Sequence, residues 1–67
     1  MDLNKKIGQR LRELRQEKNM SQGDIAKKLG VHRSYISGIE RGVRNPTVKN
    51  IEKIAEALGV GPYTLLQ

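Results

Sequence analysis

The sequence predicts an all-α fold, a compact domain of five helices that takes in the whole chain, residues 1–67. Two observations support this prediction. Apolar residues recur every three or four positions along most of the chain, which is the spacing of one face of an α-helix. Residues that favour helix starts and helix ends separate these apolar segments. The helices are expected at about residues 3–18, 22–29, 33–41, 48–58 and 62–66, and no segment is predicted to be a strand.

The first helix is predicted from an apolar stripe with a signal at each end. Asp2 is suited to cap its start, and Asn19 can end it in a left-handed conformation. Gly8 lies inside the helix, where it costs about 1 kcal/mol relative to Ala, so we expect a neighbouring backbone to pass close to it. The stripe consists of Leu3, Ile7, Leu11 and Leu14.

Residues 21–42 have the pattern of a helix-turn-helix motif. Ser21 and Asp24 fit a short capping box, and Gly30 supplies the left-handed residue that ends the first helix. Ile36 and Ile39 point inward from the second helix, which such motifs place in the DNA major groove. Its outward residues are expected to be Arg33, Ser34, Ser37, Gly38 and Arg41. DNA binding is therefore the first functional hypothesis.

The last third of the chain is predicted to hold a loop and two helices. Pro46 disfavours a helical Asn45, so residues 43–46 form the loop. Thr47 is suited to cap the fourth helix, Gly59 to end it, and Pro62 to begin the fifth. The inward residues of the fourth helix are Val48, Ile51, Ile54, Ala55 and Leu58.

Composition narrows the class of function. Phe, Trp and Cys are absent, so the core must be aliphatic, and neither a disulfide nor a thiolate metal site can form. One His, no phosphate-binding glycine loop and no paired acids argue against an enzyme, a metal site or a cofactor. No segment reads as a membrane span or a signal peptide, and no small-molecule ligand is apparent. We expect a soluble cytoplasmic domain, either a full-length protein or an excised one.

Charge favours a polyanionic partner. The net charge is +6, and residues 31–49 hold four basic side chains against one acid, Glu40. The last eighteen residues hold two acids and one base. A solvated surface is the plain explanation of such asymmetry, but its coincidence with the helix-turn-helix segment favours nucleic acid over a membrane.

Four segments in order carry a family resemblance: IGQRLRELRQEKNMSQGDIAKKLGV, SYISGIERG, NPTVKNIEKIAEALGV and PYTLL. Over residues 7–66 the chain resembles the phage-repressor and Cro type of helix-turn-helix domain, the XRE family of bacterial and phage regulators. The resemblance implies a five-helix DNA-binding domain, usually a homodimer, that binds palindromic double-stranded operators near the nucleoid and regulates transcription as a repressor or autoregulator. Cro-like repressors, restriction–modification controllers and antitoxins all remain open.

The second helix of the motif supplies the expected base contacts. Arg33 can bind guanine O6 and N7, a contact worth about 1–3 kcal/mol of discrimination, and Ser34 can bond to either kind of base. Ser37 is a candidate of shorter reach along the wall of the groove. Gly38 has no side chain, so it either lets a thymine methyl approach or contributes nothing. Unpaired amides at the start of the preceding helix favour a phosphate beside Gln22, a position to which the family assigns such a contact. The remaining phosphate contacts are expected from Arg41, Arg44, Asn45 and Lys49.

Three further side chains need an explanation. Glu40 falls off the DNA face, and Arg15 matches the family position that pairs with this acid, so the resemblance predicts an Arg15–Glu40 salt bridge at least half buried. Tyr35 either packs on the scaffold or bonds a phosphate through its hydroxyl. His32 stands at a helix N-cap position, with a phosphate contact as the functional alternative.

The C-terminal segment is the expected dimer interface, because it holds more apolar surface than a terminal turn needs and little charge. The residues are Val60, Tyr63, Leu65 and Leu66, with core capping as the alternative for the two leucines. A protein-interaction module or antitoxin-type partner binder on the same scaffold is the alternative function. DNA binding that weakens steeply with salt would separate the two.

Overall fold

The computed structural model describes residues 2–67. In this part of the chain there are four α-helices and one 3₁₀-helix: α1 (Leu3–Glu17), α2 (Gln22–Leu29), α3 (Arg33–Glu40), α4 (Val48–Leu58) and η1 (Pro62–Leu66). The all-α prediction holds, but the domain has four α-helices and not five. The last segment is a 3₁₀-helix because its five residues begin with Pro62, and Thr64 N–H donates to the Gly61 carbonyl three residues back.

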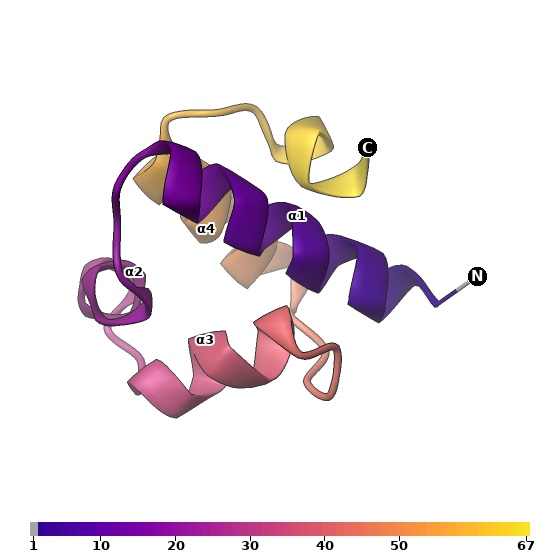
Figure 1. The fold of residues 1–67 in the computed structure, drawn as a ribbon, viewed down its shortest axis with the longest axis horizontal. Helices are drawn as coiled ribbons and strands as arrows, with labels where there is room; N and C mark the ends of the chain where they lie inside the picture. Colours follow the sequence, from indigo (N-terminus) through magenta and orange to yellow (C-terminus); the bar gives the residue numbers. More distant parts are fainter. Residues whose placement is uncertain (1) are drawn as a thin grey trace.

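The long helix α1 packs against α3 and η1. Figure 1 shows α1 crossing the molecule, with α3 on one side of it, η1 on the other and α4 behind. The motif helices α2 and α3 also pack on each other, and α4 packs on α2 and η1. This arrangement leaves the outer side of α3 uncovered by any other helix of residues 2–67 (Figure 1).

The core is aliphatic, as the composition requires. Eleven of its side chains come from the four α-helices, and η1 adds Leu65, which is completely buried. Leu3 and Val48, which were expected to face inward, are instead 54% and 75% exposed, because each is the first residue of its helix and lies at the edge of the core. The buried apolar residues are Ile7, Leu11, Leu14, Ile25, Ala26, Leu29, Ile36, Ile39, Ile54, Ala55, Leu58 and Leu65. None of the helices in residues 2–67 is long and apolar enough to cross a bilayer.

Local capping accounts for most helix boundaries. Asp2, Ser21 and Thr47 each accept backbone N–H groups at a helix start. Gly30 and Gly59 end α2 and α4 with φ near +73° and +72°. His32 is the N-cap of α3, but its side chain makes no capping hydrogen bond.

Gly8 marks where α1 and α3 meet. A Cβ atom at this position would collide with the carbonyl oxygen of Ile39 and lie 2.8 Å from that of Glu40. The expectation that a backbone passes close to Gly8 is confirmed. Because Gly8 has no side chain, the C-terminal end of α3 lies directly against α1.

Candidate nucleic-acid interface

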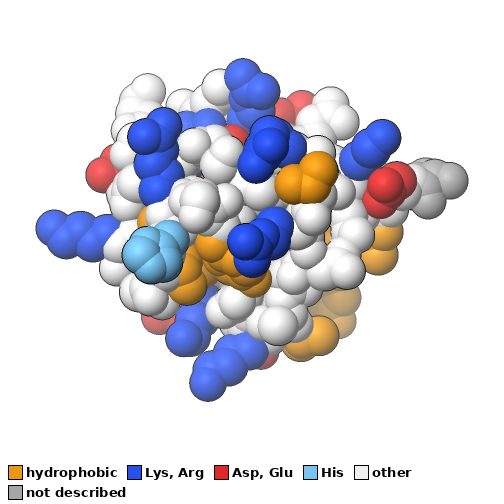
Figure 2. All heavy atoms as spheres, turned by 90° about the horizontal axis from the view of Figure 1, so that it is seen from below, with side chains coloured by type: hydrophobic (Ala, Val, Ile, Leu, Met, Phe, Trp, Pro, Cys, Tyr) orange, Lys and Arg blue, Asp and Glu red, His pale blue; other side chains and the backbone are white. Residues whose placement is uncertain are grey.

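The face that includes α3 is basic. Figure 2 views the molecule from the side on which α3 lies in Figure 1, and Lys and Arg side chains are spread across it while acidic ones lie toward its edge. Arg33 and Ser34, at the start of α3, are both exposed, and Ser37 one turn later is half-buried. Arg41 is exposed just after α3. The start of α3 therefore presents a guanidinium and a hydroxyl to solvent on a basic surface.

Gly38 does not belong to this exposed surface. It is buried, because the aliphatic part of the Arg44 side chain lies where a side chain at position 38 would stand. The predicted exposure of Gly38 is wrong for a reason that lies outside α3: the loop after the helix folds back over it. The N–H groups of Val43 and Arg44 both donate to the Gly38 carbonyl, at 3.0 and 3.2 Å. Arg44 thus occupies the space left by the missing side chain.

Tyr35 connects α3 to α4. Its side chain packs partly against the core, and its hydroxyl accepts a hydrogen bond of 2.8 Å from Asn50 Nδ2 on α4. The Arg44 guanidinium lies 6.0 Å from the centre of the Tyr35 ring, at the outer limit of a cation–π contact. Of the two expectations for Tyr35, the structure shows packing. Asn50 was not expected to contribute, because its spacing from Tyr35 carries no local signal.

The other residues expected to contact phosphate lie around the end of α3. Arg44 and Asn45 are exposed in the loop, and Lys49 is exposed in the first turn of α4. Each leaves a donor accessible at the border of the α3 face. Gln22 differs from them, since its side chain already has a partner in the protein.

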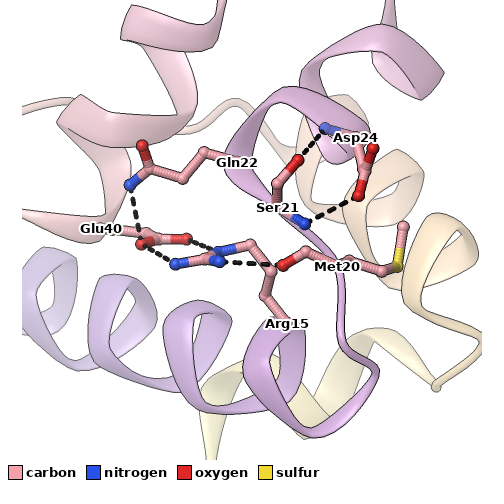
Figure 3. A network of polar contacts seen from close by, with 6 residues as sticks. All are labelled: Arg15, Met20, Ser21, Gln22, Asp24 and Glu40. Carbon is pink, nitrogen blue, oxygen red and sulfur yellow. Dashed lines mark hydrogen bonds and ion pairs between the residues drawn. The ribbon is translucent and has the colours of Figure 1, made fainter.

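Arg15 and Glu40 form a largely buried ion pair between α1 and α3 (Figure 3). Arg15 Nε donates to Glu40 Oε2 at 2.6 Å and Arg15 Nη2 donates to Oε1 at 3.0 Å, so the guanidinium binds the carboxylate through two parallel bonds. Their side chains are 13% and 4% exposed. These hydrogen bonds raise the pKa of Arg15 above its ordinary value. The remaining Arg15 nitrogen, Nη1, donates to the Met20 carbonyl at 2.9 Å, so α1 also holds the segment that enters α2.

Gln22, the first residue of α2, joins this ion pair. Gln22 Nε2 donates to Glu40 Oε1 at 3.0 Å, and Figure 3 shows the amide directed at the carboxylate with its own oxygen turned away. We name Arg15, Gln22 and Glu40 the α1–α2–α3 network. Sequence reasoning missed the Gln22–Glu40 bond because the two residues are far apart in the chain and both are common surface residues.

The start of α2 is closed by a capping box. Ser21 Oγ accepts the Asp24 N–H at 3.0 Å, and the Asp24 carboxylate accepts the Ser21 N–H at 2.8 Å. The backbone hydrogen bond from Ser21 is the main reason that the pKa of Asp24 is lowered, with the Ser21 side chain and then the charges of Lys27 and Lys28 adding to it. Within residues 2–67, no three His, Asp or Glu side chains are grouped so that they could hold a metal ion.

A helix-turn-helix family model matches residues 11–65. The chain belongs to the XRE-type helix-turn-helix family. This is a family of DNA-binding transcriptional regulators rather than of enzymes.

Restriction–modification controllers are among its close relatives. The control protein C.BamHI of Bacillus amyloliquefaciens is 55% identical over 61 residues, which are 90% of this chain and 75% of that protein. The crystal structure of the controller C.AhdI of Aeromonas hydrophila superposes with a TM-score of 0.89 and 50% identity over 92% of this chain and 94% of that one.

The family also includes longer regulators. SinR of Bacillus subtilis is 44% identical over 90% of this chain, which spans only 55% of the length of SinR. A crystal structure of SinR, the master regulator for biofilm formation, in complex with DNA superposes with a TM-score of 0.84 and covers 91% of this chain and 98% of that one.

The four residues expected at the dimer interface are not all exposed in the fold. Tyr63 and Leu66 are 79% and 40% exposed, whereas Val60 is half-buried against the core. Leu65 is 0% exposed, so it belongs to the core of the protomer and is withdrawn from the expected interface. The cause is the packing of η1 on α1 and α4, which buries Leu65, while successive residues of a helix point in different directions, so its neighbour Leu66 faces outward.

Proposed function

We propose that the chain is a sequence-specific double-stranded DNA-binding regulator of transcription, acting at the nucleoid of a bacterial or phage-infected cell. The observation that carries the proposal is the exposed start of α3, where Arg33 and Ser34 stand on a basic face of a helix fixed to α1 and α4. Membership of the family and the DNA complex of SinR support it. In this proposal α3 enters the major groove, which is wide enough for one helix.

The residues have two kinds of role. Arg33 binds the O6 and N7 atoms of a guanine, Ser34 bonds to a neighbouring base, and Ser37 contacts the groove wall. The phosphates are held by Gln22, Arg41, Arg44, Asn45 and Lys49. Because phosphate contacts fix position without reading sequence, specificity depends mainly on the start of α3.

We further propose that the chain binds as a homodimer on a palindromic operator. One α3 helix offers few base contacts, and Gly38 adds none because Arg44 covers it. A two-fold dimer would double the contacts and separate the two α3 helices by roughly 34 Å, one turn of DNA. The exposed Tyr63 and Leu66 supply apolar surface for the contact between the protomers.

Selection from a library of random duplexes tests the proposal. We expect a symmetric consensus with half-sites about ten base pairs apart, centre to centre. Arg33→Ala should relax one position in each half-site, Arg44→Ala should weaken all sequences alike, and Lys53→Ala, on the exposed side of α4, should change neither. Failure to enrich any sequence would contradict the proposal.

Salt dependence separates DNA binding from a protein-interaction module on the same scaffold. With six to ten phosphates contacted by a dimer, affinity should fall about 10³-fold or more between 50 and 200 mM salt. A protein partner bound through apolar contacts would show a much weaker dependence. Measurement of the dissociation constant by fluorescence anisotropy at four salt concentrations gives the slope.

A further inference from the structure

The α1–α2–α3 network contains one hydrogen bond in addition to those of the ion pair, the bond from Gln22 to Glu40. Arg15 already donates to both oxygens of the Glu40 carboxylate, through Nε and Nη2. Gln22 adds a third bond, to Oε1 at 3.0 Å, from the first residue of α2. This bond is the network's link to the helix end where a DNA phosphate is expected.

We propose that Glu40 is a positioning residue for the phosphate contact of Gln22, an inference that rests on the proposed DNA binding. A carboxylate only accepts hydrogen bonds, so it determines which end of the Gln22 amide faces it: the NH₂ group points to Glu40 and the oxygen points away (Figure 3). An amide nitrogen has two N–H groups, and the second remains for a phosphate oxygen.

Fixing the side chain in advance favours binding. A free glutamine has several rotamers, and a DNA contact that must select one of them loses the corresponding entropy. Because Glu40 is 4% exposed and held by two bonds from Arg15, the anchor for Gln22 is itself rigid. Arg15 also neutralises Glu40, so the carboxylate can orient a DNA-binding group without repelling the phosphates.

A comparison of Gln22→Ala in two backgrounds tests the proposal with the duplex selected above. The first background is the native protein, and the second is Arg15→Met with Glu40→Met, which removes the acceptor without leaving a buried charge unpaired. We expect Gln22→Ala to weaken DNA binding about tenfold in the native protein, as for a lost hydrogen bond to a charged group, and less than twofold in the second background. Equal losses in both would overturn the proposal.

Lys49→Ala is the matched control, because Lys49 is an exposed residue of α4 and lies outside the α1–α2–α3 network. It should weaken binding by the same factor in both backgrounds, which would show that the double substitution leaves the docking of the domain on the duplex unchanged. If no duplex is bound by the native protein, the proposed function fails. If the duplex is bound and Gln22→Ala has no effect, only the positioning role fails.

Nuclear magnetic resonance of the native protein tests the same idea without any substitution. ¹⁵N relaxation should show the side-chain amide of Gln22 to be rigid before DNA is added, whereas the amides of the exposed Gln9 and Gln16 on α1 should be mobile. Addition of the duplex should shift the Gln22 amide resonances and leave those of Gln9 and Gln16 nearly unchanged. A Gln22 amide as mobile as the other two would overturn the proposal.

Discussion

Glu40 stands at the end of the helix proposed to enter DNA, where an unpaired carboxylate would repel phosphates. The fold turns it inward and gives it three hydrogen-bond donors, two from Arg15 and one from Gln22. Each donor comes from a helix other than α3. The acid therefore helps to fix the angle of α3 and does not weaken the basic face.

Removal of Glu40 should destabilise the protein strongly. Glu40→Ala leaves the largely buried Arg15 guanidinium without its carboxylate partner, at a cost of about 3 kcal/mol. For a domain of this size that corresponds to a fall in Tm of about 12 °C or more, measured by circular dichroism. Glu52→Ala, which removes an exposed acid from α4, should change stability by no more than about 0.5 kcal/mol. A shift of only a degree or two in the Glu40 variant would refute the structural role of the ion pair.

Single residues also show where sequence reasoning reached its limit. The Arg15–Glu40 pair could be expected from the family pattern, because both residues lie in segments that carry the family resemblance. The hydrogen bond from Gln22 to Glu40 could not be predicted, since it depends on how α2 and α3 are oriented in space. The burial of Gly38 depends on the path of a loop that has no helical periodicity to predict it.

At the scale of elements, helix boundaries follow local chemistry closely. The ends of α2 and α4 lie where Ser21, Gly30, Thr47 and Gly59 place them, because a cap acts within a few residues of itself. α1 and α3 end one residue earlier than expected, at Glu17 and Glu40. The C-terminal segment was harder to predict, since five residues after Pro62 are too few for periodicity to separate an α-helix from a 3₁₀-helix.

The capping box of α2 should give stability a dependence on pH. The pKa of Asp24 is lower in the folded protein than in the unfolded chain, so its ionised form stabilises the fold. That contribution is complete above the unfolded pKa, about 3.9, and is lost as the pH falls through the folded value. Thermal melts of the native protein and of Asp24→Asn should therefore differ at pH 6 and converge toward pH 2. A constant difference between them would contradict this prediction.

The contact between α1 and α3 should be sensitive to a single methyl group. Gly8→Ala gains about 1 kcal/mol of helix propensity. The added Cβ must nevertheless push α3 away from α1, because it meets the backbone carbonyls of Ile39 and Glu40. We expect a net loss of about 1–3 kcal/mol in urea denaturation, the usual cost of overpacking.

Gly23→Ala provides the control for this substitution. Gly23 is also helical, but its added Cβ would meet only Ser21 Oγ, at an ordinary 3.6 Å. The Gly23 variant should be as stable as the native protein or more stable. Similar stability changes in the two variants would show that helix propensity, and not the contact between α1 and α3, governs position 8.

The whole molecule combines a small aliphatic core, a basic face around α3 and exposed apolar side chains on η1. The class of fold could be predicted because periodicity and caps agree along the entire chain. The extent of the proposed dimer surface could not be predicted, because it depends on which side chains of η1 face the core. Leu65 faces inward and Leu66 outward, although they are neighbours of the same residue type.

Association should therefore depend on Leu66. We expect the native protein to sediment as a dimer at micromolar concentration, and Leu66→Glu to shift it toward monomer and weaken operator binding, because the charge would lie at the apolar contact. Val48→Glu, at an exposed apolar position at the start of α4, should leave the sedimentation unchanged. A native protein that stays monomeric with and without a palindromic duplex would rule out the proposed dimer.

The position of the Arg44 side chain over Gly38 constrains how this protein could evolve or be engineered. A longer side chain at position 38 would need the space that Arg44 now fills, so the two positions are coupled through volume. A larger side chain at position 38 alone would have to displace Arg44 before the new side chain could reach a base. A smaller side chain at position 44 alone would leave the space beside Gly38 unfilled. A new operator preference at this part of α3 therefore requires two changes made together. Redesign libraries should vary positions 38 and 44 jointly.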